Sequence, residues 1–300
     1  MNQKMIQEVP LVSVITPAYN SEKTIQSTLL SAMQQDYPNM EYIVVNDGSK
    51  DDTQKIVESM QAHNPRIKFI NNPNNLGISR SRNVGMEHAS GEIFAVLDSD
   101  DLRIRKNKIS KQVEFLQQNQ AVGILGTNSI VSRDGRYFYK QENLTDKDIR
   151  WNSIKGTQFL HSSIIYPKDV YEKIGGYDSK VRYADDRDFQ LRAGKYFDFA
   201  NLPEYTVLYN SHVDNVSNRH WQRQGLESMY MSLKYCPDYP NAFAGISKRI
   251  FNLGYRVLTK SLDSISPQLK PYLKEMIQGK QEFPSELFEI PTYGNDSIDR

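Results

Sequence analysis

The sequence predicts an α/β fold in which a mostly parallel sheet is flanked by helices and followed by a helical C-terminal extension. Short apolar runs alternate with segments of helical periodicity up to about residue 105. This alternation is typical of parallel strands connected by helices that cover both faces of the sheet. Helical spacing then dominates between residues 225 and about 280, which predicts the extension.

The first half of the chain carries four expected strands with three expected helices between them. Three apolar residues four apart (Ile25, Leu29 and Met33) predict a first helix with Asn20 as its N-cap. Further helices are expected from near Asp51 and over about 79–88. The expected strands are 11–16, 42–45, 67–70 and 93–97.

Past Lys106 the alternation loosens. Strands are expected at 122–125, 163–166 and 207–209, and helical spacing returns beyond residue 225. The tail after Glu282 contains prolines, acids and a Gly-Asn pair, which predicts a flexible end. We therefore expect a main domain over residues 1–220 and a helical extension over 221–300.

Bulk composition excludes several classes of protein. The formal net charge is +1, from 37 basic and 36 acidic side chains, so there is no electrostatic footprint for nucleic acid. The single cysteine, Cys236, cannot form an internal disulfide, which favours a reducing, cytoplasmic compartment. We expect no signal peptide and no transmembrane helix, because the first residues lack an apolar core and no run of about 18 apolar residues occurs.

The most informative motif is LDSDD, which ends the strand expected at 93–97. Asp98, Asp100 and Asp101 lie so close together that their charges repel unless a cation or solvent relieves them. Oxygen ligands on a tight turn suit Mg²⁺ or Mn²⁺. Residues two apart on an extended turn point the same way, so Asp98 and Asp100 could reach one cation, whereas Asp101 would cap the following segment. The alternative is a solvated acidic loop.

Three polar clusters follow expected strands, at 17–20, 46–49 and 98–101. In open α/β sheets, ligands bind outside the carboxyl ends of the strands. If the strands are parallel neighbours, the clusters converge at one edge. Asp47 could then accept hydrogen bonds from a base or a ribose; alternatively, it only stabilises its own turn.

Five other side chains are candidates for chemistry. Arg82 could reach a phosphate or base edge, or form an ion pair with the acidic loop. Asp185 and Asp186 open an expected helix, where acids are favoured by the macrodipole, but one of them could present a base to a cleft. His212 is either structural or a metal ligand beside a carboxylate, and His161 could line an acceptor cleft.

In their order and spacing these motifs resemble the family 2 glycosyltransferases of GT-A fold, which use an activated nucleotide sugar. The resemblance implies a Rossmann-like sheet and a catalytic domain over 1–220, with its nucleotide-sugar half at about 10–105 and its acceptor half at about 106–220. The motifs cover roughly residues 10–220 and are VSVITPAYN, YIVVNDGSKDDT, NNLGISRSRNVGMEHASGEIFAVLDSDD, the stretch from Gly175 to Asp186, and YNSHVDNVS.

The resemblance also implies roles for individual residues. Asp100 and His212 would ligate Mn²⁺ or Mg²⁺, Asp186 would be the catalytic base, and His161 and Asp185 would belong to the acceptor site. The chain departs from the family pattern at Asp185, where Glu is usual, and at Asn210, where Arg is frequent. The residues expected to bind the nucleotide sugar are Pro17, Ala18, Tyr19, Asp47, Arg82, Asp98 and Ser99.

The implied reaction is inverting transfer of a hexosyl unit from a nucleotide diphosphate sugar to a hydroxyl of a glycan or lipid-linked acceptor, in cell-surface polysaccharide or glycoconjugate synthesis. UDP is the expected nucleotide because it is frequent in the family. A nicotinamide dehydrogenase is excluded because TPAYNSEKT lacks the GxGxxG pattern. The main alternative is a non-catalytic nucleotide-sugar-binding protein, which would need neither Asp186 nor His212.

The segment 241–262 carries four basic residues and no acid. Its helical spacing is compatible with peripheral contact at the inner face of an anionic membrane, near a lipid-linked acceptor. The alternatives are a helix packed on the catalytic domain and a homodimer contact. The basic residues are Lys248, Arg249, Arg256 and Lys260.

Overall fold

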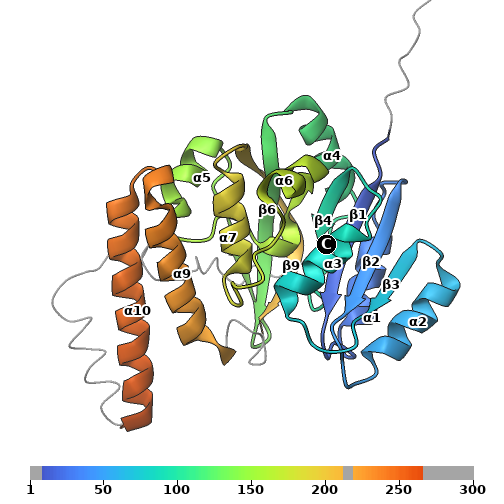
Figure 1. Ribbon diagram of the computed structural model, residues 1–300, viewed down its shortest axis with the longest axis horizontal. Helices are drawn as coiled ribbons and strands as arrows, with labels where there is room; N and C mark the ends of the chain where they lie inside the picture. Colours follow the sequence, from blue (N-terminus) through green and yellow to red (C-terminus); the bar gives the residue numbers. More distant parts are fainter. Residues whose placement is uncertain (1–8, 212–218, 266–300) are drawn as a thin grey trace, which may run out of the picture.

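A computed structural model describes residues 9–211 and 219–265, with side chains as far as residue 254. One nine-stranded sheet runs through the molecule in the order β3-β2-β1-β4-β8-β6-β9-β5, with β7 paired to β6 (Figure 1). The strands are β1 Val12–Ala18, β2 Met40–Asn46, β3 Ile67–Asn71, β4 Ile93–Val96, β5 Leu102–Arg103, β6 Val122–Arg133, β7 Arg136–Lys140, β8 Ile165–Pro167 and β9 Asp198–Ser211.

Helices cover both faces of this sheet, as predicted (Figure 1). Two short 3₁₀ turns, η1 (His161–Ser163) and η2 (Cys236–Asp238), complete the secondary structure of the described residues. The α-helices are α1 Ile25–Met33, α2 Thr53–His63, α3 Ile78–Glu87, α4 Lys108–Gln118, α5 Asp146–Ser153, α6 Lys168–Ile174, α7 Asp185–Ala193, α9 Trp221–Tyr235 and α10 Ala242–Ile265.

The four strands of the first half are parallel, and the second half of the sheet is mixed. β1 pairs in parallel with β2 and β4, and β2 with β3. β8 then runs antiparallel to both β4 and β6, whereas β9 is parallel to β6. The prediction of a mostly parallel sheet therefore describes the first half better than the second.

Two apolar layers hold the sheet between its helices. Val14 of β1 belongs to the layer that contains α1 and α4, and its neighbour Ile15 belongs to the layer that contains α3, α5, α6 and α7. Because both faces are buried, the strands read as unbroken apolar runs. In α3, a Cβ on Gly85 would lie 2.7 Å from Ile15 Cγ2. This glycine therefore lets α3 approach β1 closely.

The predicted N-cap of the first helix is wrong. Asn20 has φ of 51°, in the left-handed region, and α1 begins only at Ile25. The Asn20 N–H donates to Ser49 Oγ at 2.9 Å, and its side-chain oxygen accepts from the Lys50 N–H at 2.8 Å. Asn20 thus connects the loops after β1 and β2 instead of capping a helix, and Asn tolerates that backbone conformation better than most residues.

The two C-terminal helices pack beside α7, with α10 outermost in the series α7, α9, α10 (Figure 1). Met231 and Tyr235 of α9 are buried in the same apolar cluster as Phe189 of α7. No helix among the described residues combines the length and apolar character needed to span a bilayer. The expected flexible tail after Glu282 and the expected ligand His212 lie outside the described residues.

Candidate functional site

The loops after β1, β2 and β4 meet at one edge of the sheet, which confirms the predicted convergence. These three strands are adjacent and parallel, so their carboxyl ends share that edge. Ser21 Oγ, after β1, lies 2.8 Å from Ser99 Oγ, after β4. Pro17 and Ala18 are buried beneath this edge, whereas Tyr19 is half exposed upon it.

Asp47 orders the loop that leads into α3. Its carboxylate is buried and accepts hydrogen bonds from the Leu76 N–H at 2.8 Å, the Gly77 N–H at 2.9 Å and Asn72 Nδ2 at 3.0 Å. The next residue, Gly48, has φ of +70°, and a Cβ there would lie 2.8 Å from the Asn74 carbonyl carbon. Asp47 therefore stabilises a distant loop, while the Asn46 side chain accepts the Ser49 N–H within the turn itself, and the contact of Asp47 with a nucleotide stays a prediction.

Asp101 anchors the acidic loop to the interior of the protein. It is 1% exposed and accepts hydrogen bonds from Ser162 Oγ and the Asn210 N–H, so it does not cap the following segment as expected. Burial raises the pKa of Asp101 well above its ordinary value, and the nearby charges of Asp100 and Asp98 raise it further. A raised pKa favours the neutral form of Asp101, and this lowers the electrostatic repulsion among the three acids.

Asn210 connects the acidic loop to β9. Its side-chain amide donates to the Asp100 carbonyl oxygen at 2.6 Å. The Asp98 N–H donates to Ser162 Oγ at 3.1 Å, so the same loop is also attached to η1. Asn210, at a position where the family frequently has Arg, therefore fixes the backbone of Asp100, the predicted metal ligand.

Arg82 joins three elements of the site. Its guanidinium is buried, donates to Asp98 Oδ1 at 2.7 Å and forms a short ion pair with Asp185. It also lies over the ring of Tyr177, with 5.4 Å between Cζ and the ring centroid. The ion pair with the acidic loop, one of the two interpretations of Arg82, is therefore present, and it connects α3, the loop after β4 and α7.

The two acids that open α7 differ in exposure. Asp185 is buried, and burial raises its pKa to about 6 although Arg82 opposes that shift. Asp186 is partly exposed and accepts the Arg187 N–H at 2.7 Å. Burial raises the pKa of Asp186 as well, against the opposing effect of Arg82. Of the pair, only Asp186 is partly exposed at the start of the helix.

His161 lies in the interior and not in an open cleft. It is 5% exposed, its Nε2 lies 3.0 Å from the Tyr177 hydroxyl, and burial lowers its pKa well below the ordinary value. The η1 turn directs the ring beneath Tyr177, which explains why the expected exposure is absent. In this structure His161 is a neutral neighbour of Arg82.

The donor set on the acidic loop suits a hard divalent cation. The Asp98 side chain is 27% exposed and Asp100 is partly exposed at the same edge. Carboxylate oxygens of this kind match Mg²⁺ and Mn²⁺. Within residues 9–211 and 219–265, no group of three His, Cys, Asp or Glu side chains forms a complete metal site. The further ligand expected for the ion, His212, lies outside those ranges.

Comparison with known proteins decides the family. A model described as glycosyl transferase family 2 matches residues 13–175. The chain belongs to this glycosyltransferase family. An uncharacterized family relative, a glycosyltransferase of Haemophilus influenzae, is 29% identical over 289 residues, which cover 93% of this chain and 89% of that protein. The chondroitin synthase of Pasteurella multocida is 28% identical over 73% of this chain but only 22% of its own length.

Solved structures show that this family 2 glycosyltransferase has the GT-A fold. The mannosyltransferase PcManGT from Pyrobaculum calidifontis, in complex with GDP-Man and Mn²⁺, superimposes with a TM-score of 0.64 at 20% identity, covering 91% of this chain and 81% of that chain. S. aureus TarS in complex with UDP-GlcNAc superimposes with a TM-score of 0.59 at 22% identity, covering 89% and 78% of the two chains.

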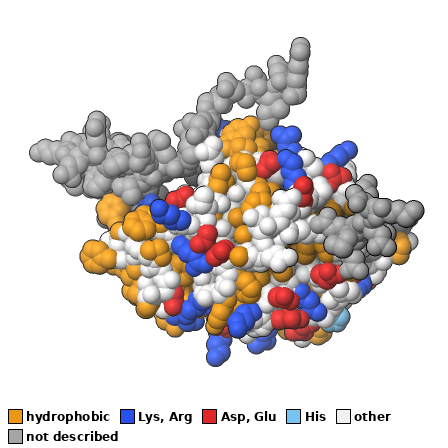
Figure 2. Space-filling model, turned by 90° about the horizontal axis from the view of Figure 1, so that it is seen from above, with side chains coloured by type: hydrophobic (Ala, Val, Ile, Leu, Met, Phe, Trp, Pro, Cys, Tyr) orange, Lys and Arg blue, Asp and Glu red, His pale blue; other side chains and the backbone are white. Residues whose placement is uncertain are grey.

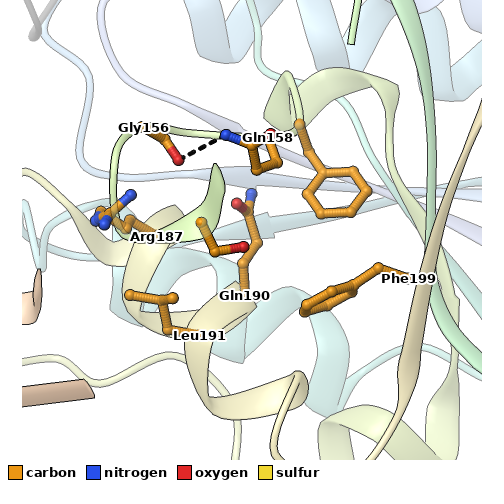
Figure 3. A pocket seen from close by; sticks show the side chains of 8 residues that line it. Gly156, Gln158, Arg187, Gln190, Leu191 and Phe199 are labelled. Carbon is orange, nitrogen blue, oxygen red and sulfur yellow. Dashed lines mark hydrogen bonds between the residues drawn. The ribbon is translucent and has the colours of Figure 1, made fainter. Parts of the chain in front are cut away.

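Several residues that shape the site were not predicted. Ser162 and Glu227 carry no local sequence signal, because each acts on a segment far away in the chain. Behind α7 the glycosyltransferase also has a small pocket lined by Gly156, Gln158, Arg187 and five other residues (Figure 3). Arg187 contributes a buried Nε without a hydrogen-bond partner there, a feature that nothing in the sequence indicates.

Proposed function

We propose that this family 2 glycosyltransferase catalyses inverting transfer of a hexosyl unit from a nucleotide diphosphate sugar, with UDP as the nucleotide, to a hydroxyl of a glycan or lipid-linked acceptor in cell-surface polysaccharide or glycoconjugate synthesis. The observation that carries the proposal is the bridge made by Arg82. It brings the acidic loop, expected to hold the diphosphate, to the helix that carries Asp186. A donor site and a candidate base thus share one edge of the sheet.

The known proteins support the donor class. TarS binds UDP-GlcNAc and PcManGT binds GDP-Man, each according to its structure, and chondroitin synthase is named for a polysaccharide. We assign Pro17, Ala18, Tyr19 and Asp47 to the base and ribose of the donor. We assign three further residues to the same nucleotide-sugar pocket: Arg82, Asp98 and Ser99.

Asp100 and His212 would hold Mn²⁺ or Mg²⁺, and the exposed carboxylates of the acidic loop fit such an ion. When bound, the ion supplies Lewis-acid stabilisation of the departing diphosphate. PcManGT, which has the same fold, was solved with Mn²⁺. Asn210 and Asp101 fix the backbone of the acidic loop from its buried side. The loop therefore keeps the partly exposed side chains of Asp98 and Asp100 at the same edge of the sheet.

Asp186 removes the proton of the acceptor hydroxyl as that oxygen attacks the anomeric carbon. Its partly exposed carboxylate and raised pKa suit a base whose proton affinity must exceed that of an ordinary aspartate. Asp185 and His161 complete the acceptor side in this proposal. Both are buried, so they shape the acceptor side from within the protein, and Asp185 also contributes its charge.

Residues 241–262 are proposed to contact the inner face of the cell membrane from the cytoplasm. Hydrophobic side chains gather on the flank formed by α9 and α10 (Figure 2), and on α10 Phe243 is 86% exposed and Ile250 is 60% exposed. Lys248 lies on the same helix. The alternative is that these side chains form a homodimer contact instead of a membrane contact.

A thermal-shift screen of nucleotide sugars with and without Mn²⁺ tests the donor, and release of free nucleotide from the best donor tests catalysis. We expect metal-dependent stabilisation by a UDP-sugar and its turnover when an acceptor is added. Stabilisation without any turnover would favour the non-catalytic binding protein. Absence of any metal-dependent stabilisation across the screen would contradict the proposed donor class.

A further inference from the structure

Glu227 of α9 binds the backbone that leads into α7. Its carboxylate accepts hydrogen bonds from the N–H groups of three consecutive residues: Arg182 at 3.4 Å, Tyr183 at 2.7 Å and Ala184 at 3.1 Å. The next two residues are Asp185 and Asp186. One side chain of the C-terminal extension therefore holds the segment from which the candidate base projects.

The backbone just before α7 takes its hydrogen-bond partner from α9. The N-cap of α7 is Ala184, which has no side-chain oxygen, and no side chain caps the helix from that position. The N–H groups at a helix start lack partners within the helix and are usually satisfied by a Ser, Thr, Asp or Asn at the N-cap. Within the first turn, Asp186 Oδ1 accepts the Arg187 N–H, whereas Glu227 accepts the N–H of Ala184 and of the two residues before it. The negative charge of Glu227 is favourable near the positive end of the helix dipole.

Further contacts align α9 with α7 beyond its first turn, and the two helices lie side by side (Figure 1). Ser232 Oγ accepts from Arg187 Nη2 at 3.1 Å, and the Tyr235 hydroxyl donates to Asp188 Oδ1 at 2.8 Å. These bonds fix the body of α7. Glu227 differs from them because it acts on the turn immediately before Asp186.

We propose that Glu227 is a positioning residue for transfer, which holds the 182–184 turn so that the Asp186 carboxylate stays at the acceptor side of the donor site. The inference rests on the proposed role of Asp186 as base. Without Glu227, three N–H groups lose their acceptor and the turn can move. A displacement of about 1 Å at a reacting group lowers rates by about 100-fold, while in the described part of the chain the side-chain hydrogen bonds of Glu227 go to residues 182–184 and not to the loops after β1, β2 and β4.

The test compares kcat and donor KM for Glu227→Ala and Glu227→Gln, using the donor found in the screen. Glutamine keeps one side-chain oxygen of the same reach, so it retains part of the hydrogen bonding. We expect kcat to fall about 10- to 100-fold in the alanine variant and distinctly less in the glutamine variant, with donor KM within about twofold of the parent. The matched control, Glu58→Ala, removes an exposed Glu of α2 and leaves both constants unchanged.

A parent-like kcat in Glu227→Ala, or equal losses in the alanine and glutamine variants, overturns the inference. Hydrogen–deuterium exchange gives a readout that needs no activity: amides 182–184 of Glu227→Ala should exchange faster while those of β1 and β2 stay protected. Unchanged exchange at 182–184 also overturns it. If the parent enzyme turns over no donor, the proposed function fails, and the exchange experiment still decides whether Glu227 holds the turn.

Discussion

Arg82 is 2% exposed, and its guanidinium contacts two carboxylates that come from separate parts of the chain. A buried cation is tolerated only when it is paired, and each acid gains from the same pairing. Asp98 and Asp185 lie in two motifs that the sequence presents as independent. Their connection through one side chain is what turns two motifs into a single site.

Replacing Arg82 should therefore affect both stability and donor binding. Arg82→Gln leaves Asp185 buried without its cation, and losing one partner of a buried pair costs about 3–5 kcal/mol. We expect a lower free energy of unfolding in denaturant titrations and a weaker thermal shift with donor and Mn²⁺. Arg80→Gln, an exposed change on the same helix, is the control and should leave both measurements as in the parent. If Arg82→Gln were as stable as the parent, the pairing of Arg82 with Asp98 and Asp185 would not contribute to stability as proposed.

Residue types and local spacing were sufficient to place Asp47, Asp98 and Asp100 at one edge of the sheet, whereas Asp186 was predicted only as a candidate base at the start of a helix. They were not sufficient to assign the inward role of Asp101, which depends on Ser162 and Asn210 from later parts of the chain. The burial of His161 likewise depends on Tyr177, which the sequence does not place beside it. Such long-range contacts leave no local signal.

At the scale of elements, Glu41 of β2 joins three segments beneath the sheet edge opposite the site. Its carboxylate accepts from Ser13 Oγ of β1 at 2.6 Å and from the Ser90 N–H at 2.6 Å, and pairs with Lys68 of β3 at 2.7 Å. Burial alone would raise the pKa of Glu41, but these partners together lower it. The ionised form therefore stabilises the fold.

Stability should consequently depend on pH through Glu41. A lowered pKa in the folded state means that the contribution is present above the unfolded value of about 4.3 and disappears as the pH falls through the folded value. Glu41→Gln should lower the free energy of unfolding by about 1–3 kcal/mol at pH 7, and the gap to the parent should narrow below about pH 4. Denaturant titrations at pH 7 and at about pH 3 measure this, with exposed Glu58→Gln as control. A gap that is independent of pH would show that Glu41 acts without its charge.

Elements with continuous apolar runs were predictable, and elements with polar interiors were not. β1, β2 and β4 were found from sequence because each is buried on both faces, and β3 was found from its short apolar run although it is only partly buried. β6 was expected only over 122–125, yet it continues to Arg133 through Thr127 and Ser129, which are fully buried. Thr127 and Thr206 share a hydrogen bond of 2.6 Å between β6 and β9, so these two hydroxyls satisfy each other, whereas the buried Ser129 hydroxyl has no hydrogen-bond partner. Periodicity does not detect strands of this kind.

At the scale of the whole molecule, α10 has two different sides. Arg249 Nε donates to the Ile154 carbonyl oxygen at 2.8 Å, and a Cβ on Gly245 would lie 2.7 Å from Ile154 Cγ2. These contacts dock the helix on the catalytic domain, as one of the sequence interpretations expected. Phe243 and Ile250 point away from that contact and remain exposed.

The exposed side chains predict an effect on membrane binding. If the flank contacts an anionic bilayer, Phe243→Ser should reduce co-sedimentation with vesicles containing phosphatidylglycerol, because a buried aromatic side chain contributes to interfacial binding. Tyr137→Ser, an exposed change on β7, serves as the control. If the parent does not sediment with the vesicles at low salt, the membrane proposal is ruled out. A concentration-dependent dimer in analytical ultracentrifugation would favour the homodimer contact instead.

The proposed sugar transfer depends on Asp186 as the base. The most direct measurement is kcat and donor Kd for the parent and Asp186→Asn, with the donor from the screen and saturating Mn²⁺. We predict a loss of about 10²- to 10⁴-fold in kcat, with donor Kd within about threefold, because the nucleotide loops do not depend on Asp186. Transfer by Asp186→Asn at the parent rate would contradict the assignment.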